Sequence, residues 1–378
     1  MTKDDGAFHY IILSGFLLRL LLLVCTCTDI LPVPDAHVDA DNFDDFALGH
    51  PGFFSDDIDH LTNYTRFLSL LYILTDDSRW FAQFLNFSLG ILSLVYLRKI
   101  VCLLDISENK AKYVMLIASL MPFQNVYSVV LMREAWVNFF IVLSIYHFIY
   151  WYLQRGNSGK QIVLTLTSIL LASWMHAGAF GLLIGYFLAF VTYFRQGDKV
   201  RISKSSYAAL FLLLVFAAIL LLNLNALLSK FMVDDFGNYV EAKSAGEGGG
   251  SDYLTWLDLS SPQKILMFLP LKVIYFVYSP IIVDWRGLND IVAFLMDSSI
   301  YLYLSWIIFT RKTAVSKYRL LKRYLLISFL VTTVVFAFGT SNTGTAIRHR
   351  AKICSVMLIM FSVSSVKKGE ENIYEESV

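Results

Sequence analysis

Residues 207–228 read YAALFLLLVFAAILLLNLNALL, a stretch without a single charged side chain. About 20 consecutive apolar residues are needed to cross the ~30 Å hydrocarbon core of a bilayer. Comparable runs occur at Ile11–Cys27 and Tyr324–Phe338. Over all 378 residues, 57% are hydrophobic and 16% are charged, whereas soluble domains have about 45–50% apolar and about 25% charged residues. The sequence therefore predicts an all-α polytopic membrane protein.

Hydropathy predicts about ten transmembrane helices within a single integral membrane domain that covers residues 1–378. The predicted spans are residues 9–28, 80–97, 113–131, 135–153, 161–175, 177–194, 206–228, 291–310, 323–340 and 351–366. Two further apolar stretches are ambiguous. Residues 64–75 are too short to span, and residues 265–283 are interrupted by Pro270, Lys272 and Pro280.

The distribution of lysine and arginine predicts the orientation, because cytoplasmic loops carry an excess of these residues. Basic residues gather after every second predicted span, that is, after the second, fourth, sixth, eighth and tenth. The loops concerned are residues 98–112, 155–160, 195–204, 311–323 and 367–368. Both termini are then cytoplasmic. If residues 265–283 crossed the membrane fully, the basic cluster at 311–323 would lie outside, so we expect 265–283 to be re-entrant or interfacial. We expect residues 64–75 at the outer surface.

Two large outer loops follow from this topology. Residues 29–79 are rich in aspartate, and residues 229–264 contain the run Gly248-Gly249-Gly250, which a helix tolerates poorly. The first apolar run is expected to remain as the first membrane helix rather than a cleaved signal peptide, since no A-x-A site follows it.

The cysteines and the missing motifs exclude several classes. Cys25, Cys27, Cys102 and Cys354 lie in or beside apolar segments, without metal-ligand spacing or a disulfide framework. A net charge of +1 and the lack of a basic motif predict no nucleic-acid partner. The sequence has no Walker, G-x-S-x-G, H-E-x-x-H or dinucleotide motif, which argues against an ATP-driven pump, a serine hydrolase and a zinc protease.

Outside the first outer loop, which contains Arg66 and Arg79, the topology places Arg133, Arg286, Arg348 and Arg350 on the outer side, where the positive-inside rule does not favour them. Charges near membrane depth are costly and are usually paired or functional. The planar guanidinium donates bidentate hydrogen bonds and suits phosphate groups. These arginines are therefore candidate pyrophosphate ligands, and the alternative is that each anchors a helix end by snorkelling.

Asp39 and Asp41 form a D-x-D pair in the first outer loop. Such a pair can bridge a divalent cation to a phosphate, or one carboxylate can act as general base towards a sugar hydroxyl. His176, in the turn between two predicted spans, is a third candidate acid or base. The alternatives are a solvated acidic loop and a packed or capping histidine. We predict no cofactor, and a divalent metal is the less favoured alternative.

The turn from Asn342 to Arg350, NTGTAIRHR, resembles the C-terminal signature of bacterial polysaccharide polymerases of the Wzy type, including EpsG-like proteins. Other segments fit the same group or polyprenyl-dependent glycosyltransferases with the GT-C membrane fold: Pro122 through Ser128 to Leu131–Ala135, Tyr72 through Asn86 to Gly90, Trp174–Gly178, and Tyr275 through Pro280 to Trp285. The similarity runs over most of the chain in order and spacing.

The resemblance implies a GT-C-like architecture in the bacterial inner membrane. It implies a polymerase of O-antigen, capsule or exopolysaccharide that joins undecaprenyl-pyrophosphate-linked repeat units at the periplasmic face. On this reading Arg133, Arg348 and Arg350 hold pyrophosphate, and Asp39 or Asp41 activates the acceptor hydroxyl. The implied partners are the lipid-linked oligosaccharide, membrane lipid, a chain-length regulator and a flippase.

Two other classes stay open. One is a GT-C glycosyltransferase that adds a single sugar from a polyprenyl-phosphate donor, or a ligase that moves finished glycan to lipid A. The other is a secondary transporter or flippase. Transporters tend to show inverted repeats and helices broken at mid-membrane, and the sequence shows no internal repeat.

Overall fold

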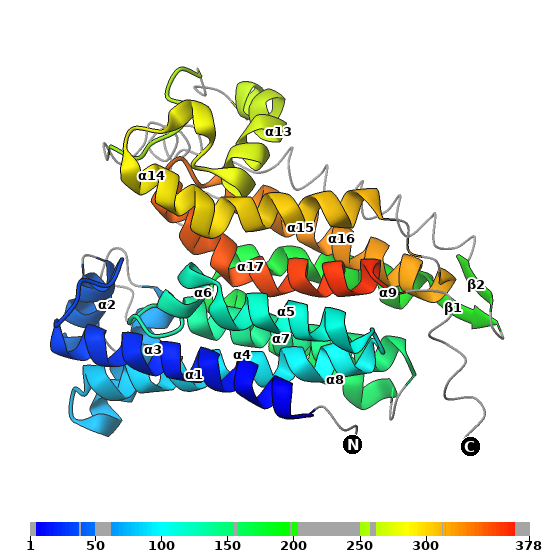
Figure 1. Ribbon diagram of the computed structural model, residues 1–378, viewed down its shortest axis with the longest axis horizontal. Helices are drawn as coiled ribbons and strands as arrows, with labels where there is room; N and C mark the ends of the chain where they lie inside the picture. Colours follow the sequence, from blue (N-terminus) through cyan, green and yellow to red (C-terminus); the bar gives the residue numbers. More distant parts are fainter. Residues whose placement is uncertain are drawn as a thin grey trace. The chain divides into compact units, whose positions relative to one another are not determined.

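The computed structural model describes residues 5–37, 39–49, 62–154, 158–196, 199–202, 250–257, 262–311, 313 and 315–366. The predicted span 206–228 and most of the predicted outer loop 229–264 lie outside these residues. Within them the chain is helical, apart from one isolated bridge and one antiparallel hairpin of β1 (Tyr193–Gln196) and β2 (Lys199–Ile202), as Figure 1 shows.

Five helical stretches in the described part of the chain are long and apolar enough to cross a membrane. They are Gly6–Thr28, Arg79–Leu103, Glu134–Tyr152, Leu288–Thr310 and Ser316–Phe338. Shorter apolar helices lie at Gly159–Met175, Ala177–Phe190 and Leu266–Tyr278. The five long stretches coincide with predicted spans, in agreement with the expectation of a helical membrane protein.

The chain divides into two compact units. Unit 1 comprises Met1–Phe180, Leu304–Ala314 and Ala351–Val378, and unit 2 comprises Gly181–Tyr303 and Val315–Arg350. Because α15 (Ser299–Thr310) and α17 (Thr343–Ser364) each continue from one unit into the other, the division does not follow the order of the sequence.

Unit 1 contains the first eight helices, together with the end of α15 and most of α17. The first eight are α1 (Asp5–Thr28), α2 (Asp39–Leu48), α3 (Asn63–Thr75), α4 (Arg79–Leu103), α5 (Glu108–Leu120), α6 (Pro122–Val126), α7 (Glu134–Tyr152) and α8 (Ser158–Met175), followed by a 3-10 turn at Ala177–Phe180. Helix α4 packs against α7, α7 against α8, and α1 against α4 and α5. The short helices α2 and α3 pack on each other.

The predicted span 113–131 is not one helix. Helix α5 ends at Leu120, α6 begins at Pro122, and the chain between Tyr127 and Arg133 is not regular helix. Proline disfavours helical backbone in the residue before it, and Met121 accordingly has ψ 118. Proline also lacks the N–H that would bond the carbonyl four residues earlier, so the break leaves carbonyls at the end of α5 without helical donors.

Arg19 supplies donors at this break. Its side chain is 1% exposed although it lies in the middle of α1. Its Nη1 donates to the Ser119 carbonyl at 3.3 Å, its Nη2 lies 3.5 Å from the Ala118 carbonyl, and its Nε donates to the Ser128 hydroxyl at 3.1 Å. A cation at a helix C-terminus also meets the negative end of the helix dipole. Arg19 therefore caps α5 where Pro122 ends the hydrogen-bond ladder.

Two glycines leave room for this guanidinium. A Cβ at Gly15 would lie 3.1 Å from Nη1 of Arg19 and 2.9 Å from Cβ of Ser119. A Cβ at Gly90 would lie 2.6 Å from Cβ of Ser128 and 3.4 Å from Nε of Arg19. The close approach of α1, α4 and the segment after α6 thus depends on both glycines.

Unit 2 contains α9, the hairpin and the later helices. They are α9 (Gly181–Thr192), α13 (Pro262–Tyr278), a 3-10 turn at Ile282–Asp284, α14 (Leu288–Ala293), a π-helical turn at Phe294–Ser298, the start of α15, α16 (Ser316–Phe338) and the start of α17. Helix α16 packs against α9 and α13.

Helices α9 and α16 approach each other through a Gly181-x-x-x-Gly185 motif. A Cβ at Gly181 would lie 2.6 Å from the Cα of Thr332, and one at Gly185 would lie 1.7 Å from Oγ of Ser328. Small residues spaced in this way allow membrane helices to pack backbone against backbone.

The two ambiguous apolar stretches are both helical. Residues 64–75 form most of α3, whose N-cap Thr62 accepts a hydrogen bond from the Thr65 N–H. Residues 265–278 of the stretch 265–283 form most of α13, which contains Pro270 and ends before the cis Ser279–Pro280 bond. Since about 20 residues are needed to span, α13 with 17 residues is short for a full crossing.

Candidate functional site

Within unit 1, three predicted outer segments meet at one end of the helices. The Tyr127 hydroxyl, after α6, donates to Asp35 at 2.6 Å. The Asn63 amide, at the start of α3, donates to the Trp174 carbonyl at the end of α8 at 2.8 Å. The described parts of the first predicted outer loop (29–37, 39–49 and 62–79), the turn before α7 and the turn after α8 therefore share this end. We call it the acidic end because it contains α2. In contrast, Lys110 bonds the Ser365 carbonyl, at the far end of α5.

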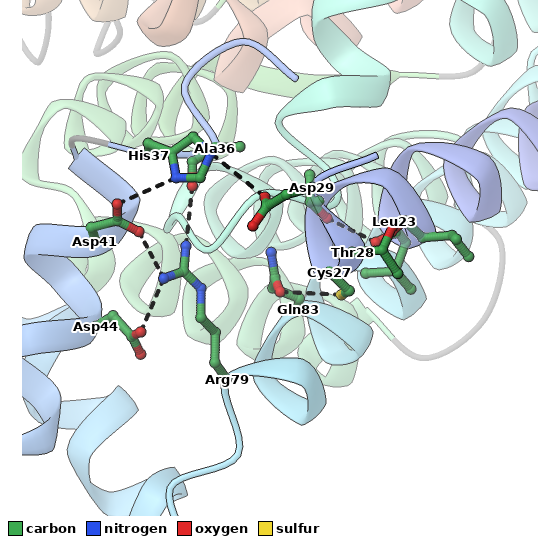
Figure 2. A network of polar contacts seen from close by, with 12 residues as sticks. Leu23, Cys27, Thr28, Asp29, Ala36, His37, Asp41, Asp44, Arg79 and Gln83 are labelled. Atoms are coloured by element: carbon green, nitrogen blue, oxygen red, sulfur yellow. Dashed lines mark hydrogen bonds and ion pairs between the residues drawn. The ribbon is translucent and has the colours of Figure 1, made fainter. Parts of the chain in front are cut away.

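Arg79 organises the acidic end. Its Nη1 donates to Asp41 at 2.7 Å and to Asp44 at 3.0 Å, and its Nη2 donates to the Ala36 carbonyl at 3.1 Å (Figure 2). This one guanidinium, at the first residue of α4, holds both ends of the segment 36–44. We call Arg79, Asp41, Asp44 and His37 the Arg79 cluster.

Asp44 also accepts a hydrogen bond from the Tyr72 hydroxyl of α3. Burial raises the pKa of the Tyr72 phenol above its usual range, and the hydrogen bond to Asp44 acts in the same direction. The phenol therefore stays protonated and donating at neutral pH. Helices α2, α3 and α4 are joined through this single carboxylate.

The predicted general bases lie on this segment in different surroundings. Asp41 places Oδ1 on Arg79 and Oδ2 3.4 Å from Nδ1 of His37, so both of its oxygens have cationic or imidazole neighbours. Asp39 begins α2 and is half-buried. The N-terminus of a helix stabilises a carboxylate in its first turn.

Arg133 and His176 also belong to the acidic end. Arg133 is the residue immediately before α7, and its guanidinium carbon lies 5.8 Å from the ring centroid of Phe43 in α2. His176 follows α8, and its Nδ1 accepts a hydrogen bond from the Gly178 N–H at 3.2 Å. The structure thus brings Asp39, Asp41 and Arg133 together around α2, and it gives His176 a turn-capping contact.

A buried ion pair lies one residue beyond Arg133. Nζ of Lys352 is 2.9 Å from Oε1 of Glu134, and the two side chains are 0% and 1% exposed. Sequence reasoning did not single out either residue. The available signal was the position of both charges within predicted spans or at their ends, because such charges are usually paired.

In unit 2, residues 250–254 are joined to the start of the segment that carries the polymerase resemblance. This segment, Asn342–Arg350, was expected to be a turn, but from Thr343 on it belongs to α17. The Tyr253 N–H donates to the Ser341 carbonyl at 2.9 Å, the Thr343 N–H donates to the Ser251 carbonyl at 3.0 Å, and Asp252 pairs with Asn342 as an isolated bridge. We call residues 340–343 the signature turn and residues 250–254 the clip.

Arg286 joins the clip from the other side. Its guanidinium donates to the carbonyls of Gly250 and Asp252, and its backbone N–H donates to the Asp290 carboxylate at 2.8 Å. The clip therefore lies between Arg286 and the signature turn. Two of the predicted arginine sites are in this way joined through one short segment.

Arg350 has a different environment from Arg286. Its Nη2 lies 2.5 Å from Oδ2 of Asp297, its Nη1 donates to the Phe276 carbonyl at 3.0 Å, and its own carbonyl accepts from the Tyr301 hydroxyl at 2.9 Å. The Arg350 and Asp297 side chains are 0% and 2% exposed. Asp297 sits in the π-helical turn before α15, a feature that often marks functional positions. The half-buried Arg348 stands two residues earlier in α17.

An open pocket of about 400 Å³ adjoins the clip. Its lining residues are Gly250, Asp252, Tyr253, Leu254, Thr255, Trp256, Asp284 and Arg286. Burial raises the pKa of the Tyr253 phenol, whereas the nearby positive charge of Arg350 acts in the opposite direction. The pocket, the signature turn and Arg350 are thus parts of one region of unit 2.

Among the described residues, no group of three or more His, Cys, Asp or Glu side chains converges as a metal site. Comparison with protein-family models, curated proteins and solved structures gives no match.

Proposed function

We propose that this chain is a membrane glycosyltransferase, a polymerase that joins saccharide repeat units carried on undecaprenyl pyrophosphate. The proposal includes about ten membrane crossings, a GT-C-like architecture, a re-entrant or interfacial α13, and a location in the bacterial inner membrane with both termini cytoplasmic. The five long apolar helices support the membrane location in its coarse form.

One observation carries the proposal. The segment that resembles the polymerases begins at the end of the signature turn, which the clip joins to Arg286, and the clip lines a pocket of ligand size. Ligand sites are typically concave volumes of about 300–1,000 Å³ with a few convergent polar groups. A cation and a pocket beside the turn that begins α17 are what a lipid-linked sugar pyrophosphate requires, because helix N-termini and guanidinium groups bind phosphate oxygens.

In the proposed reaction an acceptor hydroxyl of one repeat unit attacks the anomeric carbon of a second unit. The new glycosidic bond forms as the bond from that carbon to the lipid pyrophosphate breaks, and the bonding electrons leave with the pyrophosphate oxygen. Asp39 or Asp41 accepts the hydroxyl proton. Arg348, on α17, is the candidate pyrophosphate contact, because a cation placed where charge develops lowers the barrier. Arg133 stays a further candidate from the sequence, whereas Arg286 donates to the Gly250 and Asp252 carbonyls and holds the clip.

The test compares the surface-glycan ladder of a strain lacking this gene with that of complemented strains. A polymerase predicts collapse of the ladder to a carrier with one repeat unit, and restoration by the wild-type gene. Complementation with Arg348→Ala at normal protein level should fail, whereas Arg319→Ala, a matched exposed arginine in the predicted cytoplasmic loop, should restore the ladder.

Other ladders identify the alternatives. Loss of all glycan from the carrier would indicate a ligase or an earlier transferase. A full ladder lacking one sugar from each repeat would indicate a single-sugar transferase. An unchanged ladder would contradict a glycosyltransferase and return the chain to the transporter class.

A further inference from the structure

The lining of the pocket beside the clip includes the exposed indole of Trp256, the buried Tyr253, two carboxylates, the Thr255 hydroxyl and a guanidinium. We propose that this pocket binds a sugar ring of the repeat unit, with Trp256 as the surface on which the ring stacks. The inference rests on the proposed function for the identity of the sugar, and on the pocket itself for its chemistry.

Trp256 presents a bare indole face beside the pocket. Its side chain is 70% exposed, and it lies in the segment GSDYLTWL, residues 250–257, which has too many polar residues to be a membrane-filling stretch. Trp306 is similarly exposed, at 68%, but lies in the apolar helix α15, where lipid covers an indole. Because Trp256 lies in a polar segment and is exposed, the apolar face of its indole is not covered by the described residues. The C–H groups on one side of a sugar ring can stack on such an aromatic surface.

Polar groups of the pocket lining complement the hydroxyl groups of a sugar. Asp284 contributes a carboxylate whose buried Oδ2 accepts no hydrogen bond from the described residues. Thr255 adds a hydroxyl that both donates and accepts, and an ionised carboxylate only accepts. Sugar hydroxyls supply the matching donors at the edge of the ring.

The charges of the lining decide between a sugar and a phosphate. Asp252 and Asp284 both line the pocket, and Arg286 already donates to the carbonyls of Gly250 and Asp252. Two carboxylates repel a dianionic phosphate, whereas they accept hydrogen bonds from neutral hydroxyls at no such cost. The pocket therefore fits the saccharide part of the substrate, and the pyrophosphate contacts lie elsewhere on the turn and on α17.

The wall that carries Trp256 is held in place. Tyr253 and Leu254 are buried at 4% and 5% exposure, and the Tyr253 hydroxyl donates to the Thr340 carbonyl at 3.2 Å. Leu254 has φ 58, a left-handed backbone that a leucine rarely adopts. This conformation turns the chain just before Thr255 and Trp256, so the exposed indole stands on a fixed base. A fixed aromatic wall lowers the ordering cost of binding.

The experiment measures binding of the repeat-unit oligosaccharide, released from its carrier and free of phosphate, to the purified full-length protein in detergent by calorimetry. Wild type and the control Trp306→Ala should bind with the same Kd. Trp256→Ala should weaken binding by roughly two- to tenfold, in line with the loss of an aromatic contact, and Asp284→Asn should weaken it as well. Unaltered melting temperatures of the variants separate lost binding from lost folding.

Three results would overturn the inference. They are equal affinity of wild type and Trp256→Ala, equal weakening in the Trp306→Ala control, and absence of oligosaccharide binding by the wild type. Inorganic pyrophosphate is the second probe. If it binds and Arg286→Gln abolishes its binding, while the oligosaccharide does not bind, the pocket binds the carrier phosphate.

The glycan ladder tests the proposed function separately. A one-repeat ladder with no oligosaccharide binding rejects this pocket alone, and an unchanged ladder rejects the polymerase whatever the pocket binds.

Discussion

The ion pair between Arg350 and Asp297 provides the sharpest test of how unit 2 is stabilised. The two charged atoms are 2.5 Å apart, and the side chains are 0% and 2% exposed. Replacing Arg350 with methionine keeps an unbranched chain but leaves the Asp297 carboxylate buried without its counter-ion. Removing one partner of a buried pair costs about 3–5 kcal/mol. Since about 1.4 kcal/mol is a factor of ten, the ratio of folded to unfolded protein should fall roughly a hundredfold to several-thousandfold.

A double-mutant cycle isolates the pair. Arg350→Met and Asp297→Asn are measured singly and together, by equilibrium unfolding of the purified protein in mixed detergent micelles, followed by circular dichroism. Because the double variant buries no charge, it should be more stable than the sum of the single losses implies, with an interaction energy of about 0.5–3 kcal/mol or more. Strictly additive losses would refute the reasoning, because they would mean that the two charges do not stabilise each other.

The cycle also tests the pyrophosphate role that the resemblance implies for Arg350. A loss of activity in Arg350→Ala alone can reflect an unstable protein. The double variant removes the guanidinium while avoiding an unpaired carboxylate, so its glycan ladder reports on the guanidinium itself. Persistence of long chains in the double variant would show that Arg350 supports the fold and does not contact the substrate.

Three further perturbations test the packing described above. Gly185→Ala should lower the free energy of unfolding by about 1–3 kcal/mol or more, because its Cβ would lie 1.7 Å from Oγ of Ser328; Gly339→Ala, with nothing within 4 Å, is the control, and equal stability of the two variants would reject the close α9–α16 contact. Arg19→Leu should destabilise unit 1 because it removes the cap of α5, and an unchanged unfolding midpoint would contradict the capping role. Arg79→Gln should speed hydrogen exchange of the α2 amides while α7 amides stay protected, and unchanged exchange in α2 would show that Arg79 does not hold that helix.

Hydropathy was enough to predict the five long apolar helices, because helices of soluble domains rarely have such long apolar runs. It was not enough at Pro122, where an apolar average over residues 113–131 conceals the lost N–H and the restricted residue before it. The same averaging concealed Arg19, a single charge within an apolar run. The division into two units depends on which helices pack together over long sequence distances, and no local pattern encodes that choice.

The sequence allowed us to predict which types of residue form the candidate site. It was less informative about the groups that each of these residues contacts. The outer arginines stood out because they oppose the positive-inside bias. Their environments depend on partners far along the chain: Arg350 meets Asp297, and Arg286 meets carbonyls of the clip. A rule that each charge in an apolar segment needs a counter-charge would have flagged Asp297, but it would not have identified Arg350 as its partner.

The spacing of Arg348 and Arg350 separates their roles. Residues two apart in an α-helix are turned by about 200° from each other, since the helix has 3.6 residues per turn. The two guanidinium groups therefore leave α17 on opposite faces and are poorly placed to grip one pyrophosphate together. Because Arg350 faces the buried Asp297, the pyrophosphate contact on this helix is assigned in our proposal to Arg348, and Arg350 acts as a positioning residue that fixes the start of α17. An R-x-R pair in a helical signature thus combines one substrate-facing cation with one that holds the helix in place, and only the partner of each arginine tells the two apart.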